Sequence, residues 1–350
     1  MTQQMKHRQQ QSEESAVDQA VPPTMTAVVQ RRFGGAEVLQ LDEVPVPVPK
    51  PDQVLVGVEA ASLNALDWHF VSGTPYFIRI VAGVRRPKRA TPGADVAGIV
   101  VAVGRNVTGF AVGDTVFGEV KGGACAPYVA ADTKGLAPIP ASVSFESAAA
   151  VPVAGLTAIQ ALRTHAKLRP GERVLINGAS GGVGTMAVQI AKALGAHVTG
   201  VCSSGNVEMV RSTGADRVID YTTDDFATIG PRFDVMLDNV GNRPVADCLG
   251  VLVPDGRYVQ TSGPKDNPWL QPMLSIAGRA LRFRRASQSF HQFTAEPNRD
   301  DMVFLGELLA SGALVPQIQR TIDLTGVADA IDEISGGHTR AKIVVRPTVG

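Results

Sequence analysis

"NGASGGVGTMAVQIAKALGAHVTGVCSSGN", residues 177–206, places a glycine-rich turn between an apolar strand and a helix, and a second apolar strand follows. Gly178, Gly181 and Gly184 stand three residues apart where the helix begins. Glycines at this spacing allow a tight turn, close approach of the backbone to a diphosphate, and close packing of helix on strand. The free N–H groups and the dipole at the helix start attract the anion. The order strand, turn, helix, strand therefore predicts a dinucleotide-binding site.

The end of the second strand bears on the choice of cofactor. NAD sites usually carry Asp or Glu there, where the carboxylate binds the ribose 2′-hydroxyl. This strand ends in "VCSSGN", and the first carboxylate after it is Glu208, inside the next helix. Ser203, Ser204 and Asn206 can donate hydrogen bonds to a 2′-phosphate, which a carboxylate would repel. The turn favours NADP(H), although it contains no Lys or Arg and Arg211 lies one helical turn further on.

The texture of the chain changes near residue 150. Short β-branched segments separated by Gly, Pro and Asp fill residues 25–150, whereas strands and helices alternate after that point. Alternation of this kind predicts a doubly wound parallel sheet. We therefore predict an α/β protein in which residues 151–287 form a dinucleotide-binding domain inserted into a β-rich domain of residues 25–150 and 288–350. Residues 1–24 are polar and glutamine-rich and are predicted to be a disordered tail.

Composition excludes several functional classes. The 350 residues carry 33 Lys and Arg and 33 Asp and Glu, so zero net charge predicts neither nucleic acid nor a membrane as partner. The longest apolar run, near residues 148–162, is too short to span a bilayer. Cys125, Cys202 and Cys248 are too far apart for a zinc motif or a disulfide framework. With no hydrophobic leader at the start, the expected location is cytoplasmic.

Four stretches carry a family resemblance: "TPGADVAGIVVAVGRNVTGFAVGDTVFG", "AVPVAGLTAIQAL", "GASGGVGTMAVQIAKALGA" and the ending "RAKIVV". Together they resemble the medium-chain dehydrogenase/reductases over about residues 25–346, and the zinc-free quinone oxidoreductase branch is most similar. The resemblance implies a GroES-like catalytic domain around a Rossmann domain, with the nicotinamide in the cleft between them. It also implies a homodimer joined through the nucleotide-binding domains.

Zinc members of that superfamily carry cysteine and histidine ligands that this chain lacks. Asn64 stands in place of the first Cys, Ala94 in place of the His of a "GHE" motif, and "VPVAGLT" offers no Cys. Zinc prefers nitrogen and sulfur donors in a tetrahedral array, so we expect no metal. A missing oxyanion stabiliser costs about 3–4 kcal/mol of barrier lowering. A quinone or enone spreads the incoming charge by conjugation, so a conjugated acceptor is the expected small-molecule substrate.

The resemblance also implies roles for individual residues. Asn64 is expected at the cleft as a donor to the cofactor amide or acceptor oxygen, or else as a cap at the end of a strand. Asp67 is expected to orient its neighbours or to act as an acid, and Tyr76 is a candidate phenol donor. Lys342 reaches the cofactor or flanks the last strand. The other cofactor contacts are expected from the glycine loop and from strand ends, where ligands sit in such sheets: Thr157, Gly178, Ser180, Gly181, Gly182, Val183, Gly184, Ser203, Ser204, Asn206, Tyr221, Asn239, Gly241, Thr261, Ser262 and Gly263.

These features predict an NADPH-dependent oxidoreductase that transfers hydride to a quinone or other conjugated carbonyl without zinc. Two alternatives stay open: an NADPH-dependent 2-alkenal or enone double-bond reductase, and a non-catalytic NADPH-binding regulatory protein. Two basic clusters, residues 85–90 and 282–285, are expected to be solvated faces, or in one case the rim of a site for an anionic substrate.

Overall fold

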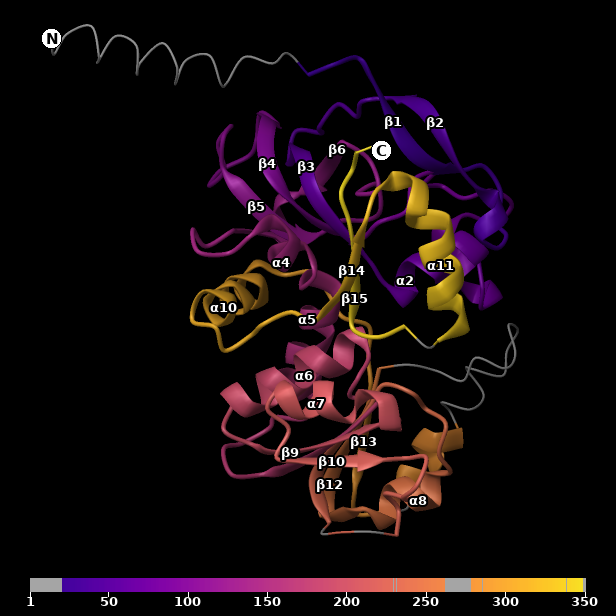
Figure 1. Ribbon diagram of the computed structural model, residues 1–350, viewed down its shortest axis with the longest axis vertical. Helices are drawn as coiled ribbons and strands as arrows, with labels where there is room; N and C mark the ends of the chain where they lie inside the picture. The colour runs from indigo at the N-terminus through magenta and orange to yellow at the C-terminus, as the bar shows by residue number, and fades with distance from the viewer. Residues whose placement is uncertain are drawn as a thin grey trace, which may run out of the picture.

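The computed structural model describes residues 21–228, 230, 232–261, 278–284, 286–337 and 339–348. Of the predicted disordered tail, residues 1–20 lie outside this range. The chain forms two domains joined by helices, with the catalytic domain above and the nucleotide-binding domain below in Figure 1. Among the described residues, no helix is both long and apolar enough to cross a membrane.

The catalytic domain is built on a seven-stranded sheet of order β14-β15-β3-β4-β5-β7, with β6 paired to β3. The first and last parts of the chain meet here, because β15 pairs antiparallel with β3. A separate antiparallel pair, β1 with β2, lies beside the sheet. The predicted GroES-like domain is confirmed. Its strands are β1 (Thr24–Gln30), β2 (Leu39–Pro45), β3 (Gln53–Leu63), β4 (Asp95–Val103), β5 (Thr115–Glu119), β6 (Tyr128–Asp132), β7 (Leu136–Pro138), β14 (Ile318–Ile322) and β15 (Lys342–Val345).

Short helices cover the edges of the catalytic domain. The helix that follows β3 begins after Asn64, whose backbone N–H donates to Oδ2 of Asp67 at 2.8 Å, and it ends at Gly73 in the left-handed region. A carboxylate in the first turn satisfies an N–H group that a helix start would leave unpaired. The helices are α2 (Ala65–Ser72), α3 (Arg79–Ala82), α4 (Phe145–Ala149) and α11 (Val327–Gly336), with 3-10 turns η1 (Ala36–Val38), η2 (Tyr76–Ile78), η3 (Thr133–Gly135) and η6 (Leu324–Gly326).

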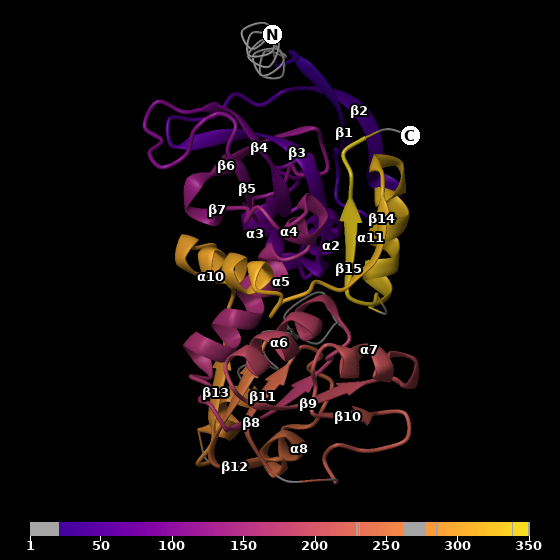
Figure 2. The same cartoon turned by 60° about the vertical axis from the view of Figure 1, so that its left-hand side comes forward.

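The nucleotide-binding domain is a six-stranded parallel sheet of order β10-β9-β8-β11-β12-β13. This is the doubly wound order, with the reversal at β8. Figure 2 shows α6 and α7 on one side of the sheet and α8 on the other. The elements are β8 (Arg173–Asn177), α6 (Gly182–Ala193), β9 (His197–Cys202), η5 (Ser204–Asn206), α7 (Val207–Ser212), β10 (Arg217–Asp220), β11 (Phe233–Asp238), α8 (Val245–Gly250), β12 (Leu252–Gln260) and β13 (Ser289–Gln292).

The sheet continues past the predicted end of the inserted domain at residue 287. Strand β13 pairs in parallel with β12, from Ser289 beside Arg257 to Gln292 beside Gln260. The predicted boundary was based on where the alternation of strands and helices ends. One short polar strand, "SFHQ", changes that pattern very little. Strand pairing therefore places residues 289–292 with the nucleotide-binding domain.

Helices of both domains meet at one buried carboxylate. Helix α5 (Pro152–Ile159) runs into the π-helical η4 (Gln160–His165), and α10 (Arg299–Ala310) packs against α5. Asp301 accepts hydrogen bonds from Nε2 of Gln160 at 2.9 Å and Nδ2 of Asn298 at 2.7 Å, and it forms an ion pair with Arg163. These contacts tie the segment that enters the nucleotide-binding domain to the segment that leaves it.

Candidate active site

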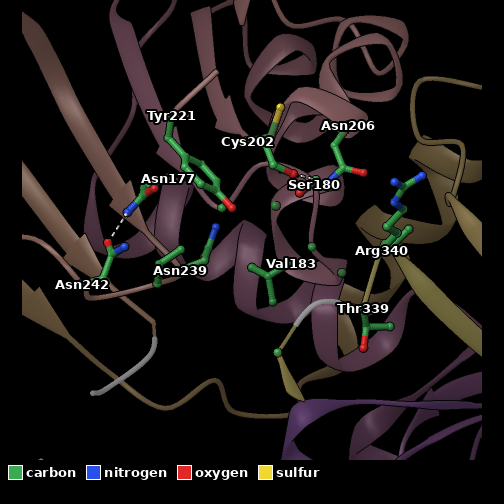
Figure 3. A pocket seen from close by; sticks show the side chains of 18 of the residues that line it. Asn177, Ser180, Val183, Cys202, Asn206, Tyr221, Asn239, Asn242, Thr339 and Arg340 are labelled. Carbon is green, nitrogen blue, oxygen red and sulfur yellow. Dashed lines mark hydrogen bonds between the residues drawn. The ribbon is translucent and has the colours of Figure 1, made fainter. Parts of the chain in front are cut away.

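A cavity of about 1010 Å³ lies between the two domains. From the nucleotide-binding domain it is lined by the glycine loop, by the end of β9 and by residues 221–226, 239–240 and 242–243. From the catalytic domain it is lined by residues 63–65, Ala154 and parts of residues 334–342. Figure 3 shows part of this lining, with Asn206, Thr339 and Arg340 on one side and Tyr221 and Asn239 on the other.

The glycine loop is shaped as the sequence predicts. Gly178 has φ +77°, a backbone conformation that residues with a side chain rarely adopt. A Cβ at Gly184 would lie 2.1 Å from the carbonyl oxygen of Gly178, so only glycine fits where α6 packs on the turn. A Cβ at Gly181 would meet only that same oxygen, at 3.6 Å, and Gly181 lines the cavity. The open space in front of Gly181 and the start of α6 suit a diphosphate.

A second segment passes directly over this loop. The N–H of Ala341 donates to the carbonyl oxygen of Ser180 at 2.9 Å, and Ala341 forms a β-bridge with Gly181. Ala341 adopts a left-handed conformation, φ +51°, which is costly for a residue other than glycine. The residues that lead into β15 are therefore held against the glycine loop. This contact brings the neighbours of Ala341 to the cavity.

Arg340 lies at the turn that follows β9. A Cβ at Gly205 would lie 3.0 Å from Nη2 of Arg340, so the guanidinium lies against this turn. Ser203, Asn206 and Arg340 all line the cavity, and Figure 3 shows Arg340 on the same side as Asn206. The turn thus has the cation that its own sequence lacks.

A carboxylate that bonds this turn, Asp220, is already occupied by hydrogen bonds. Asp220, at the end of β10, accepts from the N–H of Thr222 at 3.0 Å and from its Oγ1 at 2.7 Å. Hydrogen bonds from Ser204 and Thr222 hold the pKa of Asp220 below its usual value. Asp220 does not line the cavity, whereas Asp224 and Asp225 do, and Asp225 is ion-paired with Arg243.

Three buried polar atoms on the cavity wall have no hydrogen-bond partner within the described protein: Oδ1 of Asn206, Nδ2 of Asn239 and Oγ1 of Thr339. An unsatisfied buried polar group costs roughly 1–3 kcal/mol. Together with the space at Gly181, these atoms fit a large polar ligand that runs along the glycine loop, as a nicotinamide dinucleotide would. The residues present therefore fit such a cofactor.

A buried charge network forms the catalytic-domain side of the cavity. Nζ of Lys342 pairs with Oδ2 of Asp95 at 2.9 Å, and their side chains are 2% and 0% exposed. Lys342 also donates to Oδ1 of Asn64, whose Nδ2 donates to Asp95 at 2.9 Å. Asp95 further accepts from Ser62 at 2.6 Å and from the N–H of Val153 at 2.8 Å. Asn64 and Lys342 both line the cavity.

Two further carboxyl groups surround this network. Burial, followed by the charge of Asp95, raises the pKa of Asp67 to about 6, although N–H groups of Asn64 and Gly93 donate to it. Burial raises the pKa of Glu119 to about 8, and the charges of Asp95 and Asp67 add to the effect. Glu119 lies opposite Asp95 on the neighbouring strand. A protonated Glu119 leaves Lys342 facing fewer negative charges at neutral pH.

Most predicted site residues line the cavity, and some do not. Those that line it are Asn64, Gly178, Ser180, Gly181, Gly182, Val183, Gly184, Ser203, Asn206, Tyr221, Asn239 and Lys342. Asp67 does not line the cavity; its Oδ2 accepts a hydrogen bond from the backbone N–H of Asn64, and its predicted role stays a prediction. Tyr76 is not part of the lining, and the guanidinium of Arg79 stacks on its ring at 4.7 Å.

The remaining predicted residues in the described part of the chain do not line the cavity, and each bonds another residue of the protein. Thr157 donates to the carbonyl oxygen of Val153 one helical turn earlier, at 2.7 Å, and it does not line the cavity. Ser204 bonds Thr222 at 2.8 Å. The other two support the lining from behind: the N–H of Gly241 donates to Asp238 at 2.8 Å, and Thr261 donates to Asn239 at 2.8 Å. Ser262 and Gly263 lie outside the described residues.

Sequence reasoning missed Arg340, Thr339 and Asp95. Arg340 and Thr339 reach the cavity only because β15 pairs with β3, and a pairing across the whole chain leaves no local signal. Asp95 left a signal, since it follows Ala94 in the stretch compared with the zinc motif "GHE". Its partner Lys342 is 247 positions away.

Comparison with known proteins gives the family. Residues 50–141 match the model described as "Alcohol dehydrogenase GroES-like domain", and residues 213–345 match "Zinc-binding dehydrogenase". The chain is 33% identical to a chloroplast envelope quinone oxidoreductase homolog of Arabidopsis thaliana, over 90% of this chain and 95% of that protein. It is 44% identical to the trans-enoyl reductase pgmF of Aspergillus terreus, over 85% of this chain and 86% of that protein.

A solved structure gives the same answer. The quinone oxidoreductase from Coxiella burnetii superposes with a TM-score of 0.82 at 28% identity, covering 92% of this chain and 99% of that one. The inserted Rossmann domain, the interdomain cavity and the full-length similarity all indicate the same family. The chain belongs to the medium-chain dehydrogenase/reductase superfamily, in its quinone oxidoreductase branch, and is an oxidoreductase of the kind that uses a nicotinamide cofactor.

Proposed function

We propose that this oxidoreductase uses NADPH to reduce a conjugated carbonyl compound, a quinone or an enone, without zinc. The observation that carries the proposal is one cavity that the glycine loop, Arg340 and Asn64 all line. That arrangement offers a diphosphate site, a cation at the ribose end and an amide donor at the opposite, catalytic-domain side.

The preference for NADPH rests on charge at the turn after β9. Arg340 brings a guanidinium to Gly205, and Ser203 adds a hydroxyl group beside it. A guanidinium forms charge-assisted, often bidentate, hydrogen bonds to phosphate. Asp220, which ends β10, accepts hydrogen bonds from Thr222 and lies outside the lining. Arg340 therefore provides the cation that the sequence of the turn itself does not contain.

The residues at the family's zinc position do not fit the metal. Asn64 and Ala94 replace the expected cysteine and histidine ligands. Both oxygens of Asp95 are occupied, by Lys342, Ser62, Asn64 and the N–H of Val153. A buried ammonium at 2.9 Å from that carboxylate would repel a divalent cation. The residues at this position therefore do not support a zinc-dependent step.

The mechanism follows from Asn64 and its partners. When bound, NADPH would supply the hydride, the acceptor's conjugation would carry the negative charge to its oxygen, and a proton from solvent would complete the reduction. One Nδ2 hydrogen of Asn64 is donated to Asp95, and the second has no acceptor among the described residues. Because Asn64 lines the cavity, that N–H is placed to donate to the acceptor oxygen. Lys342, bonded to Oδ1 of the same amide, polarises the donor and counters the developing charge.

A panel assay tests the proposal. Initial rates are measured with NADPH and with NADH against quinones, 2-alkenals and simple ketones, on protein treated with a chelator. We expect NADPH to be preferred, conjugated acceptors to be reduced, and simple ketones to be inert. Clear preference for NADH, or good turnover of a simple ketone, would contradict the proposal.

The alternative of a double-bond reductase is favoured by the 44% identity to a trans-enoyl reductase. Comparing phenanthrenequinone with a 2-alkenal separates the two acceptor classes. A non-catalytic NADPH-binding protein would retain NADPH without oxidising it in the presence of any acceptor. The homodimer and the cytoplasmic location stay predictions.

A further inference from the structure

The segment of residues 76–89, between α2 and β4, exposes an unusual number of large apolar side chains. Phe77, Ile80, Val81 and Val84 are 42%, 74%, 66% and 73% exposed. Single exposed aliphatic residues are normal on a protein surface, but several within one short segment mark an interaction site. We call residues 76–89 the basic–apolar segment.

The same segment is strongly cationic. Arg85, Arg86, Lys88 and Arg89 are all exposed, and no Asp or Glu occurs anywhere in residues 75–94. Among the described residues, no ion pair involves any of these four cations, while ion pairs form elsewhere on the surface. Since the chain as a whole has zero net charge, this is a local concentration of positive charge.

Internal bonds hold the segment in a defined shape. Nε of Arg79 donates to the carbonyl oxygen of Gly73 at 3.0 Å, and its guanidinium lies 4.8 Å from the Phe33 ring centre. The N–H of Lys88 donates to the carbonyl oxygen of Ala82 at 2.7 Å, closing a turn at Gly83, which has φ +121°. The apolar side chains and the cations are thus carried by one anchored piece of backbone.

The cavity does not explain these side chains. No residue of the basic–apolar segment belongs to the cavity lining, so a role as the rim of an anionic-substrate site has no support there. Charge complementarity points instead to a partner that is both anionic and apolar. Lipid bilayers with acidic headgroups combine the two, since cations meet the headgroups while neighbouring apolar side chains enter the acyl boundary.

We propose that the basic–apolar segment docks the protein reversibly on an anionic lipid surface. Ile80, Val81 and Val84 enter the interface, and Arg85, Arg86 and Lys88 contact the headgroup phosphates. The proposal departs from the expectation, drawn from net charge alone, that a membrane is not a partner. Net charge sums over the whole surface, whereas a bilayer contacts one face.

Vesicle co-sedimentation of the full chain tests the proposal. One set of vesicles is phosphatidylcholine alone, and the other contains phosphatidylserine. We expect binding only with phosphatidylserine, and weaker binding as salt rises. R85E/R86E should lower the partition coefficient at least about tenfold, because each cation near an acidic surface contributes about fivefold and the variant reverses two of them. I80S/V81S should lower it while leaving the salt dependence in place.

Matched variants control for charge and for exposed apolar surface. R105E/R169E makes the same charge change at two exposed arginines, and V48S/V315S removes two exposed valines elsewhere. Both should bind vesicles like the parent, and thermal melting confirms that each variant folds. Absence of binding to phosphatidylserine vesicles, equal loss in the controls, or unchanged binding in the segment variants would overturn the proposal. A change of oligomeric state in I80S/V81S would also overturn it, because it would indicate that the segment contacts a protein.

Discussion

Arg340 lies far along the chain from the turn whose chemistry it completes. Its guanidinium lies against Gly205, at the turn where the proposed function places the 2′-phosphate of NADPH. Hydrogen bonds to charged groups contribute roughly 1.5–3 kcal/mol, which corresponds to about 10- to 150-fold in affinity. We expect Arg340→Ala to weaken NADPH binding by about 10- to 100-fold and to leave NADH binding nearly unchanged, as measured by fluorescence titration.

Arg211 is the matched control for that substitution. It is the cation nearest to the turn in sequence, it is exposed, and it is ion-paired with Glu208. Arg211→Ala should leave both affinities unchanged. Equal weakening of NADPH and NADH in Arg340→Ala would show that Arg340 supports the fold of the turn instead of reading the phosphate.

The raised pKa of Glu119 predicts how the free energy of unfolding depends on pH. Its folded pKa of about 8 exceeds the usual 4.5, so the folded state holds a proton that the unfolded state releases earlier. The stabilising contribution is complete below about pH 4.5 and is lost as pH rises to about 8. At about 1.36 kcal/mol per pKa unit, the loss is at most roughly 5 kcal/mol. Urea titrations should show that Glu119→Gln flattens this decline and is more stable than the parent at pH 8.5 or so. A parallel pH dependence in the two proteins would refute this.

At the scale of elements, we expect Gly184 to be needed for the fold of the glycine loop and Gly181 for cofactor binding. A Cβ at Gly184 would clash with the carbonyl oxygen of Gly178, whereas one at Gly181 meets nothing closer than 3.6 Å. Gly184→Ala should therefore destabilise the protein by roughly 1–3 kcal/mol, the usual cost of overpacking. Gly181→Ala should melt like the parent but lose NADPH affinity, because its methyl group fills the space open to a diphosphate. Normal cofactor affinity in Gly181→Ala would mean that the diphosphate does not approach this loop.

Local sequence was enough to predict the elements around the cofactor. The turn after β8, helix α6 and strand β9 follow from glycine spacing and apolar periodicity within residues 173–202, and the parallel order follows from the alternation. The approach to β15 could not be predicted in this way. Arg340 and Lys342 lie on a segment whose place depends on pairing with β3, nearly three hundred positions away in sequence. Strand β13 was missed because a short polar strand has little periodicity.

Some of the predicted site residues lie away from the cavity lining. Thr157 stands in a helix that reaches the junction, but its hydroxyl bonds the preceding turn. Tyr76 lies in a segment with no regular periodicity, and composition alone does not determine which way its side chain points. Asn64 was placed correctly at the cavity, and its dependence on Lys342 and Asp95 could be seen only once three distant strands were brought together.

For the whole molecule, Asp301 is the residue on which the connection between the domains depends most clearly. Its carboxylate is bonded by Gln160, Asn298 and Arg163. Removing one member of such a buried network typically costs about 3–5 kcal/mol. Chemical denaturation should show a loss of that size in Asp301→Ala and little change in Asp300→Ala, an exposed neighbour in the same helical turn. Equal effects of the two substitutions would show that the contacts of Asp301 do not stabilise the junction between the domains.

The most direct test of the central claim is a single turnover. Protein stripped of metal by a chelator is loaded with stoichiometric NADPH and mixed rapidly with an excess of phenanthrenequinone or a 2-alkenal, and the reduced-nicotinamide absorbance is followed. The account predicts complete oxidation of the bound NADPH with at least one of these acceptors, at a rate that added zinc does not raise. Bound NADPH that no conjugated acceptor oxidises, or oxidation that begins only when zinc is returned, would contradict it.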